Sequence, residues 1–371
     1  MLAKHFTGLP DSPLYRRDIT FLANNTIGSV LFALGVMFLL RWVRLRSNRQ
    51  VRWGRLGFPS ELFYILPSGI CTAVVIPTTT LMYTLPISVM VAMVIMRGSV
   101  IVISRVVDAV QIGQGILKKR VYAEENWAVV FELLAVGVNV LWVPSVLNAT
   151  AGFLEGLGLA AAAGLRREVV PGRGGFEFFH SAAAMTIMGL YVLAYAVRIY
   201  IMNYYKNTRA RGVPQDNEGF FAFEQIFASL AMLAAGVFFF LAPVRLGWTD
   251  ARVLEFRAAV QHLDPAALLS GIPYGAVAFF SVFIFMFQGR TATFAGLVNR
   301  LTSLIAGTTA TVLTARFLGG SLPSLHDWVG LGFIFVAVYF LTRAERRRVA
   351  EGVGQAGDVP VAPARAAGGT A

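Results

Sequence analysis

The stretch PISVMVAMVIMRGSVIVISRVVDAVQ, residues 86–111, decides the fold of this chain. Only Arg97, Arg105 and Asp108 carry charge in a run that is otherwise almost wholly apolar. About 20 apolar residues in a helix are enough to cross a hydrocarbon core roughly 30 Å thick. Similar runs recur along the 371 residues, which are 56% hydrophobic and 14% charged, whereas soluble domains are about 25% charged. The sequence therefore predicts a membrane protein with many spanning helices.

We predict an all-α, polytopic transmembrane helix bundle of about nine helices. The predicted domains are an N-terminal segment (1–19), a first transmembrane repeat (20–147), a non-cytoplasmic loop (148–178), a second repeat (179–343) and a disordered cytoplasmic tail (344–371). A short surface helix within GFLEGLGLAAAAGL, residues 152–165, is one interpretation of the loop. The predicted spans are 20–42, 61–83, 86–111, 127–147, 179–204, 221–244, 268–288, 293–317 and 328–341.

Basic residues cluster after alternate spans, and this bias predicts the orientation in the membrane. The net charge of +12 comes largely from such clusters, so we interpret it as a topology signal and not as a nucleic-acid surface. The loop 44–55 and the segment after Arg343 are therefore predicted to be cytoplasmic, with 148–178 on the opposite side. The first residues contain no apolar core of a cleavable signal peptide.

An internal repeat relates the two halves. VIMRGSVIV around Arg97 matches LVNRLTSLI around Arg300, and each segment is followed by a glycine-containing loop and then by a Trp that opens the next span, Trp127 or Trp328. Transporter folds are often built from such repeats. Four predicted spans lie between the matched helices, so the matched helices are predicted to run in opposite directions, as inverted repeats require. The alternative is that any two apolar helices look alike.

LMYTLPISVMVAMVIMRGSVIVISRVVD, residues 81–108, and GILKKRVYAEENWAVVFELLAVGV, residues 115–138, resemble the drug/metabolite transporter superfamily, particularly its nucleotide-sugar-transporter-like branch. The resemblance implies two inverted five-helix repeats with cytoplasmic termini. Only four spans are found in the first half, so we expect the helix that opens the family's fold to be missing here. Either the chain lacks it and begins outside, or the start codon is assigned too late.

Charged side chains deep in a span are costly and indicate function by default. Arg97 and Arg300 both lie near the middle of predicted spans, and two guanidinium groups would suit carboxylate or phosphate oxygens. We therefore predict a substrate site formed by Arg97, Arg300, Asn299, Ser104, Thr302, Thr79 and Tyr83. The alternative is structural, with each arginine capping carbonyls or pairing with a carboxylate.

Other polar residues in the spans have simpler interpretations. Arg198 and Glu224 lie near predicted span ends, where an interfacial position or a salt bridge is more common than proton coupling. Thr79 belongs to the run Pro77–Thr80, whose hydroxyls can satisfy a carbonyl that the proline frees. Helix kinking alone would explain that run.

Enzymatic chemistry finds little support. The sequence contains no HExxH, GxSxG or phosphate-binding GxxxxGK[ST] motif, and its four histidines are scattered. We expect no catalytic residues, no cofactor and no metal, so that transport would be secondary.

The leading hypothesis is a permease for a small polar metabolite, with anionic metabolites among the candidates, working by alternating access. The alternative is a non-transporting scaffold or regulatory protein on a degenerate transporter fold. The expected partners are the lipid bilayer and a small-molecule substrate, with no nucleic acid, and a homodimer remains open. In a bacterium the expected location is the cell (inner) membrane.

Overall fold

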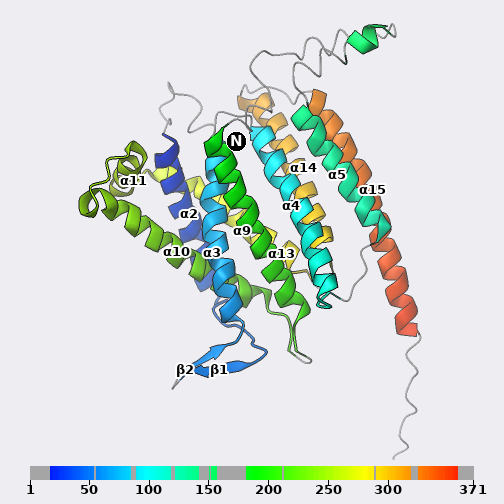
Figure 1. The fold of residues 1–371 in the computed structure, drawn as a ribbon, viewed down its shortest axis with the longest axis horizontal. Coiled ribbons are helices and arrows are strands. Elements are labelled where there is room, and N and C mark those ends of the chain that lie inside the picture. Colours follow the sequence, from blue (N-terminus) through cyan, green and yellow to red (C-terminus); the bar gives the residue numbers. More distant parts are fainter. Residues whose placement is uncertain are drawn as a thin grey trace, which may run out of the picture.

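The structure is a computed structural model that describes residues 17–53, 56–84, 89–117, 122–141, 150, 152–156, 181–210, 213–287, 290–318 and 325–357. These residues form an assembly of helices that run roughly side by side, with one small hairpin at one end (Figure 1). Helices overlap every predicted span: α2 (Asp18–Leu39), α3 (Leu62–Thr84), α4 (Val89–Gly113), α5 (Ala123–Leu141), α9 (Ala182–Asn207), α10 (Asn217–Arg245), α13 (Gly271–Phe285), α14 (Ala292–Leu318) and α15 (Leu325–Gly357).

Six helical segments in the described part of the chain are long and apolar enough to cross a membrane. The chain is therefore a multi-pass membrane protein, as the sequence predicted. Passage of α4, α5 and α14 through the bilayer stays a prediction. The six segments are Asp18–Leu39, Leu62–Met82, Ala182–Asn207, Asn217–Arg245, Pro265–Phe285 and Trp328–Arg348.

Polar side chains fix where several helices begin. Ser181 accepts a hydrogen bond from the backbone N–H of Ala184 and so starts α9. Asp216 does the same for Gly219 at 2.8 Å at the start of α10. Such caps satisfy backbone donors that have no partner in the first turn.

Four elements were not predicted from the sequence. Strands β1 (Gln50–Trp53) and β2 (Leu56–Pro59) form an antiparallel hairpin in the region expected to be a loop. Two short helices, α11 (Ala251–Gln261) and α12 (Pro265–Leu269), connect α10 to α13. Both helices are capped by an aspartate, Asp250 in α11 and Asp264 in α12, which explains why such short segments are helical.

The predicted disordered tail is partly wrong, because α15 continues to Gly357. The segment after Leu341 contains good helix formers, and contacts with another helix hold it. Arg348 forms an ion pair with Glu125 of α5, and Glu351 accepts a hydrogen bond at 2.6 Å from the hydroxyl of Tyr122. Residues 358–371 lie outside the described part, as do most residues of the predicted loop 148–178, where 152–156 are helical.

Two pairs of helices matched by the internal repeat pack against each other. Asp108 near the end of α4 accepts hydrogen bonds from the backbone N–H groups of Ala292 and Thr293 at the start of α14, so these helices are antiparallel. The α5 helix lies along α15, where the rings of Phe131 and Phe340 stack at 5.6 Å. The opposite directions of α4 and α14 agree with an inverted repeat, whereas superposition of the two halves stays a prediction.

The basic segments expected on one side of the membrane meet at one end of the bundle, which we call the basic end. It carries the hairpin, the connection between α9 and α10, and the last turns of α15 (Figure 1). Arg209 of the α9–α10 connection pairs with Glu61 at 2.8 Å, just before α3 begins. The assignment of this end to the cytoplasm stays a prediction.

Candidate functional site

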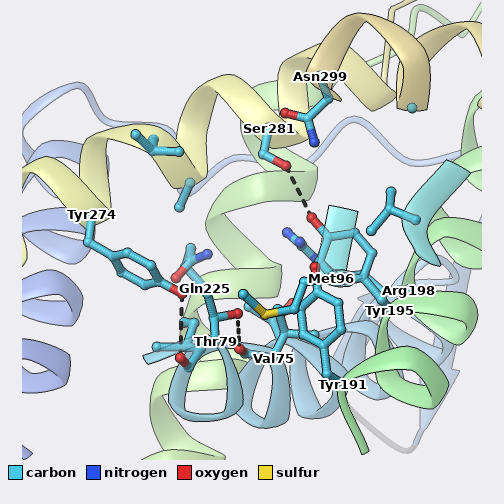
Figure 2. Close-up of a pocket in the computed structure, with 16 residues that line it drawn as sticks. Val75, Thr79, Met96, Tyr191, Tyr195, Arg198, Gln225, Tyr274, Ser281 and Asn299 are labelled. Atoms are coloured by element: carbon cyan, nitrogen blue, oxygen red, sulfur yellow. Dashed lines mark hydrogen bonds between the residues drawn. The ribbon is translucent and has the colours of Figure 1, made fainter. Parts of the chain in front are cut away.

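A cavity lies inside the bundle where α3, α4, α9, α10, α13 and α14 converge (Figure 2). The space open to the centres of water-sized molecules is about 110 Å³, well above the roughly 10–15 Å³ that one water needs. The cavity is thus large enough for several waters or for part of a small solute. Its lining residues are Thr72, Val75, Ile76, Thr79, Met96, Val100, Tyr191, Tyr195, Arg198, Gln225, Tyr274, Val277, Ala278, Ser281, Gly296 and Asn299.

Helical periodicity brings polar side chains to this cavity. In α9, Tyr191, Tyr195 and Arg198 are four and three residues apart and therefore share one face. In α13, Tyr274 and Ser281 lie two turns apart on the cavity side. The hydroxyls of Tyr195 and Ser281 are 3.5 Å apart, which links α9 to α13 across the cavity (Figure 2).

Threonines of α3 supply hydrogen-bond acceptors to the cavity. The hydroxyl of Thr72 donates to the carbonyl of Ser68 at 3.0 Å, and that of Thr79 donates to the carbonyl of Val75 at 2.7 Å. Each hydroxyl oxygen keeps lone pairs after its hydrogen is used. Pro77 removes the backbone donor that would serve the carbonyl of Ala73, whereas the hydroxyls of Thr72 and Thr79 donate to other carbonyls of the helix. Thr79 lines the cavity, and its role in a substrate site stays a prediction.

A buried ion pair forms part of the cavity wall. Arg198 donates from Nε and Nη2 to the two carboxylate oxygens of Glu224, at 2.9 and 2.8 Å. The hydroxyl of Ser68 adds a hydrogen bond to Glu224 at 2.6 Å. The two-pronged geometry matches the planar guanidinium to the carboxylate. Because both charges are buried and neutralise each other, this wall of the cavity presents no net charge.

Two amide side chains complete the polar lining. Asn299 of α14 faces the cavity opposite α3, and Gln225 of α10 lies between Tyr274 and Thr79 (Figure 2). Gln225 is only 2% exposed, and its Nε2 has no hydrogen-bond partner in the structure. Buried amide donors are nearly always paired, so this one marks the cavity as a site that can receive an acceptor.

The structure brings together only part of the predicted site. Thr79 and Asn299 line the cavity. Ser104 does not line this cavity, because its hydroxyl donates to the carbonyl of Val100 at 2.7 Å and it packs against Gly296. Thr302 does not line it either, because it is exposed and donates to the carbonyls of Val298 and Asn299. Both hydroxyls are used within their own helices.

The side chains of Arg97, Arg300 and Tyr83 lie outside the described part of the structure. The backbone of α4 and α14 nevertheless shows at which level of the bundle each arginine is attached. Ser104 lies beside Gly296 in the antiparallel α4–α14 pair, and at 1.5 Å of rise per residue this register places Arg97 and Arg300 within about one turn of each other along the bundle. Their substrate role stays a prediction.

The residues missed from the sequence leave a signal in its periodicity. A polar side chain recurs seven residues apart on three helices: Thr72 and Thr79, Tyr191 and Arg198, and Tyr274 and Ser281. Seven residues equal almost two helical turns, so each pair defines a polar stripe within an apolar span. Of the two interpretations offered for Arg198 and Glu224, an interfacial position or a salt bridge, the structure shows a salt bridge, formed between these two residues in the cavity wall.

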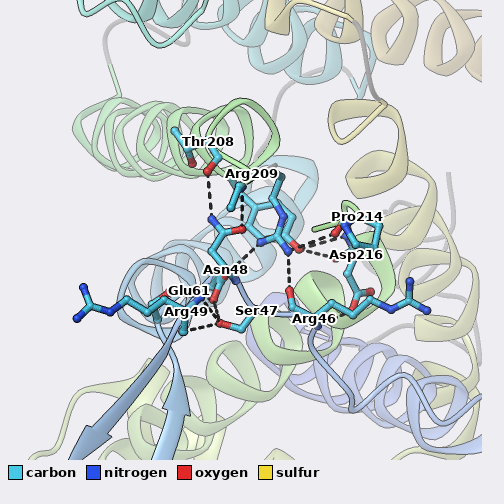
Figure 3. A network of polar contacts seen from close by, with 12 residues as sticks. Arg46, Ser47, Asn48, Arg49, Glu61, Thr208, Arg209, Pro214 and Asp216 are labelled. Carbon is cyan, nitrogen blue, oxygen red and sulfur yellow. Dashed lines mark hydrogen bonds and ion pairs between the residues drawn. The ribbon is translucent and has the colours of Figure 1, made fainter. Parts of the chain in front are cut away.

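A second polar cluster closes the basic end of α3 and α9 (Figure 3). Glu61 accepts hydrogen bonds from the hydroxyl of Ser47, the backbone N–H of Asn48 and the guanidinium of Arg209. Burial raises the pKa of Glu61, but the hydrogen bonds together lower this pKa by more than burial raises it. The carboxyl therefore titrates below its usual range. Glu61 therefore stays charged at neutral pH and joins the hairpin segment to the α9–α10 connection.

Comparison with known proteins adds no relative. No protein-family model matches the chain, and no curated protein matches it. The geometry of the cavity and the basic end is therefore the ground on which function is inferred.

Proposed function

We propose that the protein is a secondary transporter of a small polar metabolite. The observation that carries this proposal is a cavity with polar side chains in its wall, lined by six helices of a membrane bundle, α3 and α4 from the first half and α9, α10, α13 and α14 from the second. Substrate sites in transporters built from repeats typically lie between the repeats, near the middle of the membrane. A cavity that both halves line is suited to be exposed to each side in turn.

The resemblance to the drug/metabolite transporter superfamily is part of this proposal. It is supported by the antiparallel packing of α4 with α14, because inverted repeats run in opposite directions through the membrane. Arg97 and Arg300 extend the proposal to anionic metabolites, since arginine suits carboxylate and phosphate oxygens. The energy source is proposed to be an ion or solute gradient, because the sequence carries no phosphate-binding GxxxxGK[ST] loop.

Transport into proteoliposomes tests the proposal. The reconstituted protein would be given a panel of radiolabelled sugars, amino acids, organic acids and sugar phosphates, with and without the same unlabelled compound inside. We expect saturable uptake of at least one class that rises with unlabelled compound inside. No movement of any class would favour the alternative, a non-transporting scaffold.

Two variants of α13 connect uptake to the cavity. Ala278 lines the cavity, so Ala278→Trp should fill it and reduce uptake at least tenfold. Phe280 is on the same helix but 68% exposed, so Phe280→Trp should transport normally. Equal uptake by both variants would separate transport from this cavity.

A further inference from the structure

The feature that carries the inference is the unpaired donor of Gln225. The side chain follows Glu224 on α10 and turns into the cavity between Tyr274 and Thr79 (Figure 2). Its Nε2 is buried without a partner, although Gln225 is 2% exposed. Burying such a group without a partner is unfavourable, so an acceptor in the cavity would relieve that cost.

The rest of the described lining indicates which kind of ligand could carry the acceptor for Gln225. Thr72 and Thr79 have spent their hydroxyl hydrogens on helix carbonyls and offer acceptors. A hydroxyl group can satisfy both kinds of position because it donates and accepts. The aromatic faces of Tyr191 and Tyr195 give an apolar surface for the carbon skeleton of a ring.

The charge of the cavity wall selects against an anion at this position. Both oxygens of Glu224 receive hydrogen bonds from Arg198, so an anionic ligand would have to compete with a buried carboxylate for the same guanidinium. It would also lie close to the charge of Glu224. An uncharged ligand leaves the pair intact.

We propose that the cavity binds an uncharged polyhydroxylated ligand of the sugar or polyol class, and that Gln225 donates from Nε2 to one of its oxygens. This inference rests on the proposed function for the use of the cavity. It concerns binding, however, and binding can be measured without transport.

Three probes that share one ring and differ in charge test the ligand class: glucose, glucose 6-phosphate and glucosamine. Binding to the purified, detergent-solubilised protein would be measured by thermal shift and calorimetry. We expect glucose to raise Tm in a saturable way and to bind at least tenfold more tightly than the charged probes. Tighter binding of glucose 6-phosphate would overturn the proposal in favour of an anion site, and no binding of any probe would also overturn it.

Replacement of Gln225 tests the donor. Gln225→Met keeps the length of the side chain and removes no hydrogen bond that Nε2 makes to protein, so glucose should bind at least tenfold more weakly with Tm unchanged or raised. Unaltered glucose affinity in this variant would overturn the role of Gln225.

Gln111 provides the matched control, because this buried glutamine donates to the carbonyl of Tyr200 at 3.0 Å and accepts from Asn203 at 2.8 Å. Gln111→Met should lower Tm and leave glucose affinity unchanged in the folded protein. Glucose binding without transport of any solute would overturn the transporter proposal and leave this inference intact, whereas transport of a charged solute without binding of glucose would do the reverse.

Discussion

At the scale of single residues, the pair Arg198 and Glu224 combines full burial with bidentate geometry. A charge in such a place is stable only with its partner, since breaking a buried pair costs about 3–5 kcal/mol while replacing both partners costs much less. We expect Glu224→Gln and Arg198→Met each to lower Tm strongly. The double variant Arg198→Met with Glu224→Gln should be more stable than the sum of the single effects implies. Thermal unfolding in detergent measures all three.

An exposed carboxylate supplies the control for this cycle. Glu351 pairs with Arg347 at 3.3 Å, one turn away on α15, and both side chains are more than half exposed. Pairs of this kind contribute little to stability, and the amide oxygen introduced by Glu351→Gln can still accept the hydrogen bond from Tyr122, so this variant should leave Tm nearly unchanged. Equal losses from Glu224→Gln and Glu351→Gln would contradict the role assigned to burial.

Sequence reasoning identified some site residues and missed others for one physical reason. The cost of charge in hydrocarbon singles out Arg97 and Arg300 without any structure. Arg198 lies nearer to the end of its span, where a charge is inexpensive by position alone. That it meets Glu224, which is 26 residues away and on another helix, depends on helix packing. Gln225 carries no charge, so its unpaired amide becomes visible only once burial and partners are known.

At the scale of helices, α2 and the α12–α13 corner approach so closely that their backbones touch at glycines. A Cβ added at Gly28 would overlap the carbonyl of Leu268, and one added at Gly271 would overlap the carbonyl of Asn25. Small residues allow such close approach between membrane helices. These glycines therefore fix the distance between α2 and the second half of the chain.

Substitution of these glycines has a clear expected outcome. Gly28→Ala and Gly271→Ala should each destabilise the protein, because the atoms in the way belong to backbone. Gly35 on α2 has open space where a Cβ would lie, and alanine is favoured over glycine within a helix by about 0.5–1 kcal/mol. Gly35→Ala should therefore be neutral or stabilising. Thermal unfolding of the three variants measures these effects. A loss of Tm in Gly35→Ala equal to the losses in the other two variants would contradict the role assigned to close backbone contact.

The elements that could be predicted from the sequence are those with long hydrophobic runs. Long apolar runs marked every large helix, because lipid-facing segments need apolar side chains over their whole length. The β1–β2 hairpin gave no such signal, since QVRW and LGFP are short and partly basic. The helix α15 extends beyond its apolar run because charged residues that form helices well follow it, and ion pairs to α5 hold them in place.

At the scale of the whole molecule, basic residues gather at one end of the bundle, and the orientation remains to be measured. In a Cys71→Ser background, Arg52→Cys places a thiol on an exposed residue of the hairpin. Leu263→Cys places one at the other end, at a residue that is 48% exposed. A membrane-impermeant maleimide added to intact cells should label position 263 and not 52.

Permeabilised cells give the control, since both positions should then react. Labelling of position 52 alone in intact cells would reverse the orientation. The relative direction of the two halves could be anticipated, because an even number of spans between two helices makes them run in opposite directions. How α5 lies along α15 could not, because packing faces depend on all neighbouring helices together.

Acidification should weaken the link at the basic end through Glu61. Its pKa is lower in the folded protein than the roughly 4.3 of an unperturbed glutamate. The stabilisation is therefore complete above that unfolded value and is lost as the pH falls through the lower, folded value. Hydrogen exchange of the Asn48 backbone N–H should accelerate on acidification below about pH 4, and Glu61→Gln should show faster exchange already at neutral pH. If the exchange rate of the Asn48 N–H depended neither on pH nor on the Glu61→Gln substitution, the role of Glu61 in this link would be contradicted.

The shared carboxylate of Glu61 also governs how the basic end can move. Its hydrogen bonds to Ser47, Asn48 and Arg209 come from two chain segments and converge on one group. Arg209 also donates to the carbonyl of Arg46, and Asn48 exchanges hydrogen bonds with Thr208 and Ala210, so separation of the two segments would break several contacts at the same time. Opening at this end would therefore be an all-or-none event with a barrier, and intermediate degrees of opening would be scarcely populated. A fluorescence-distance distribution between the hairpin and the α9–α10 connection would then show two separate peaks instead of one broad one.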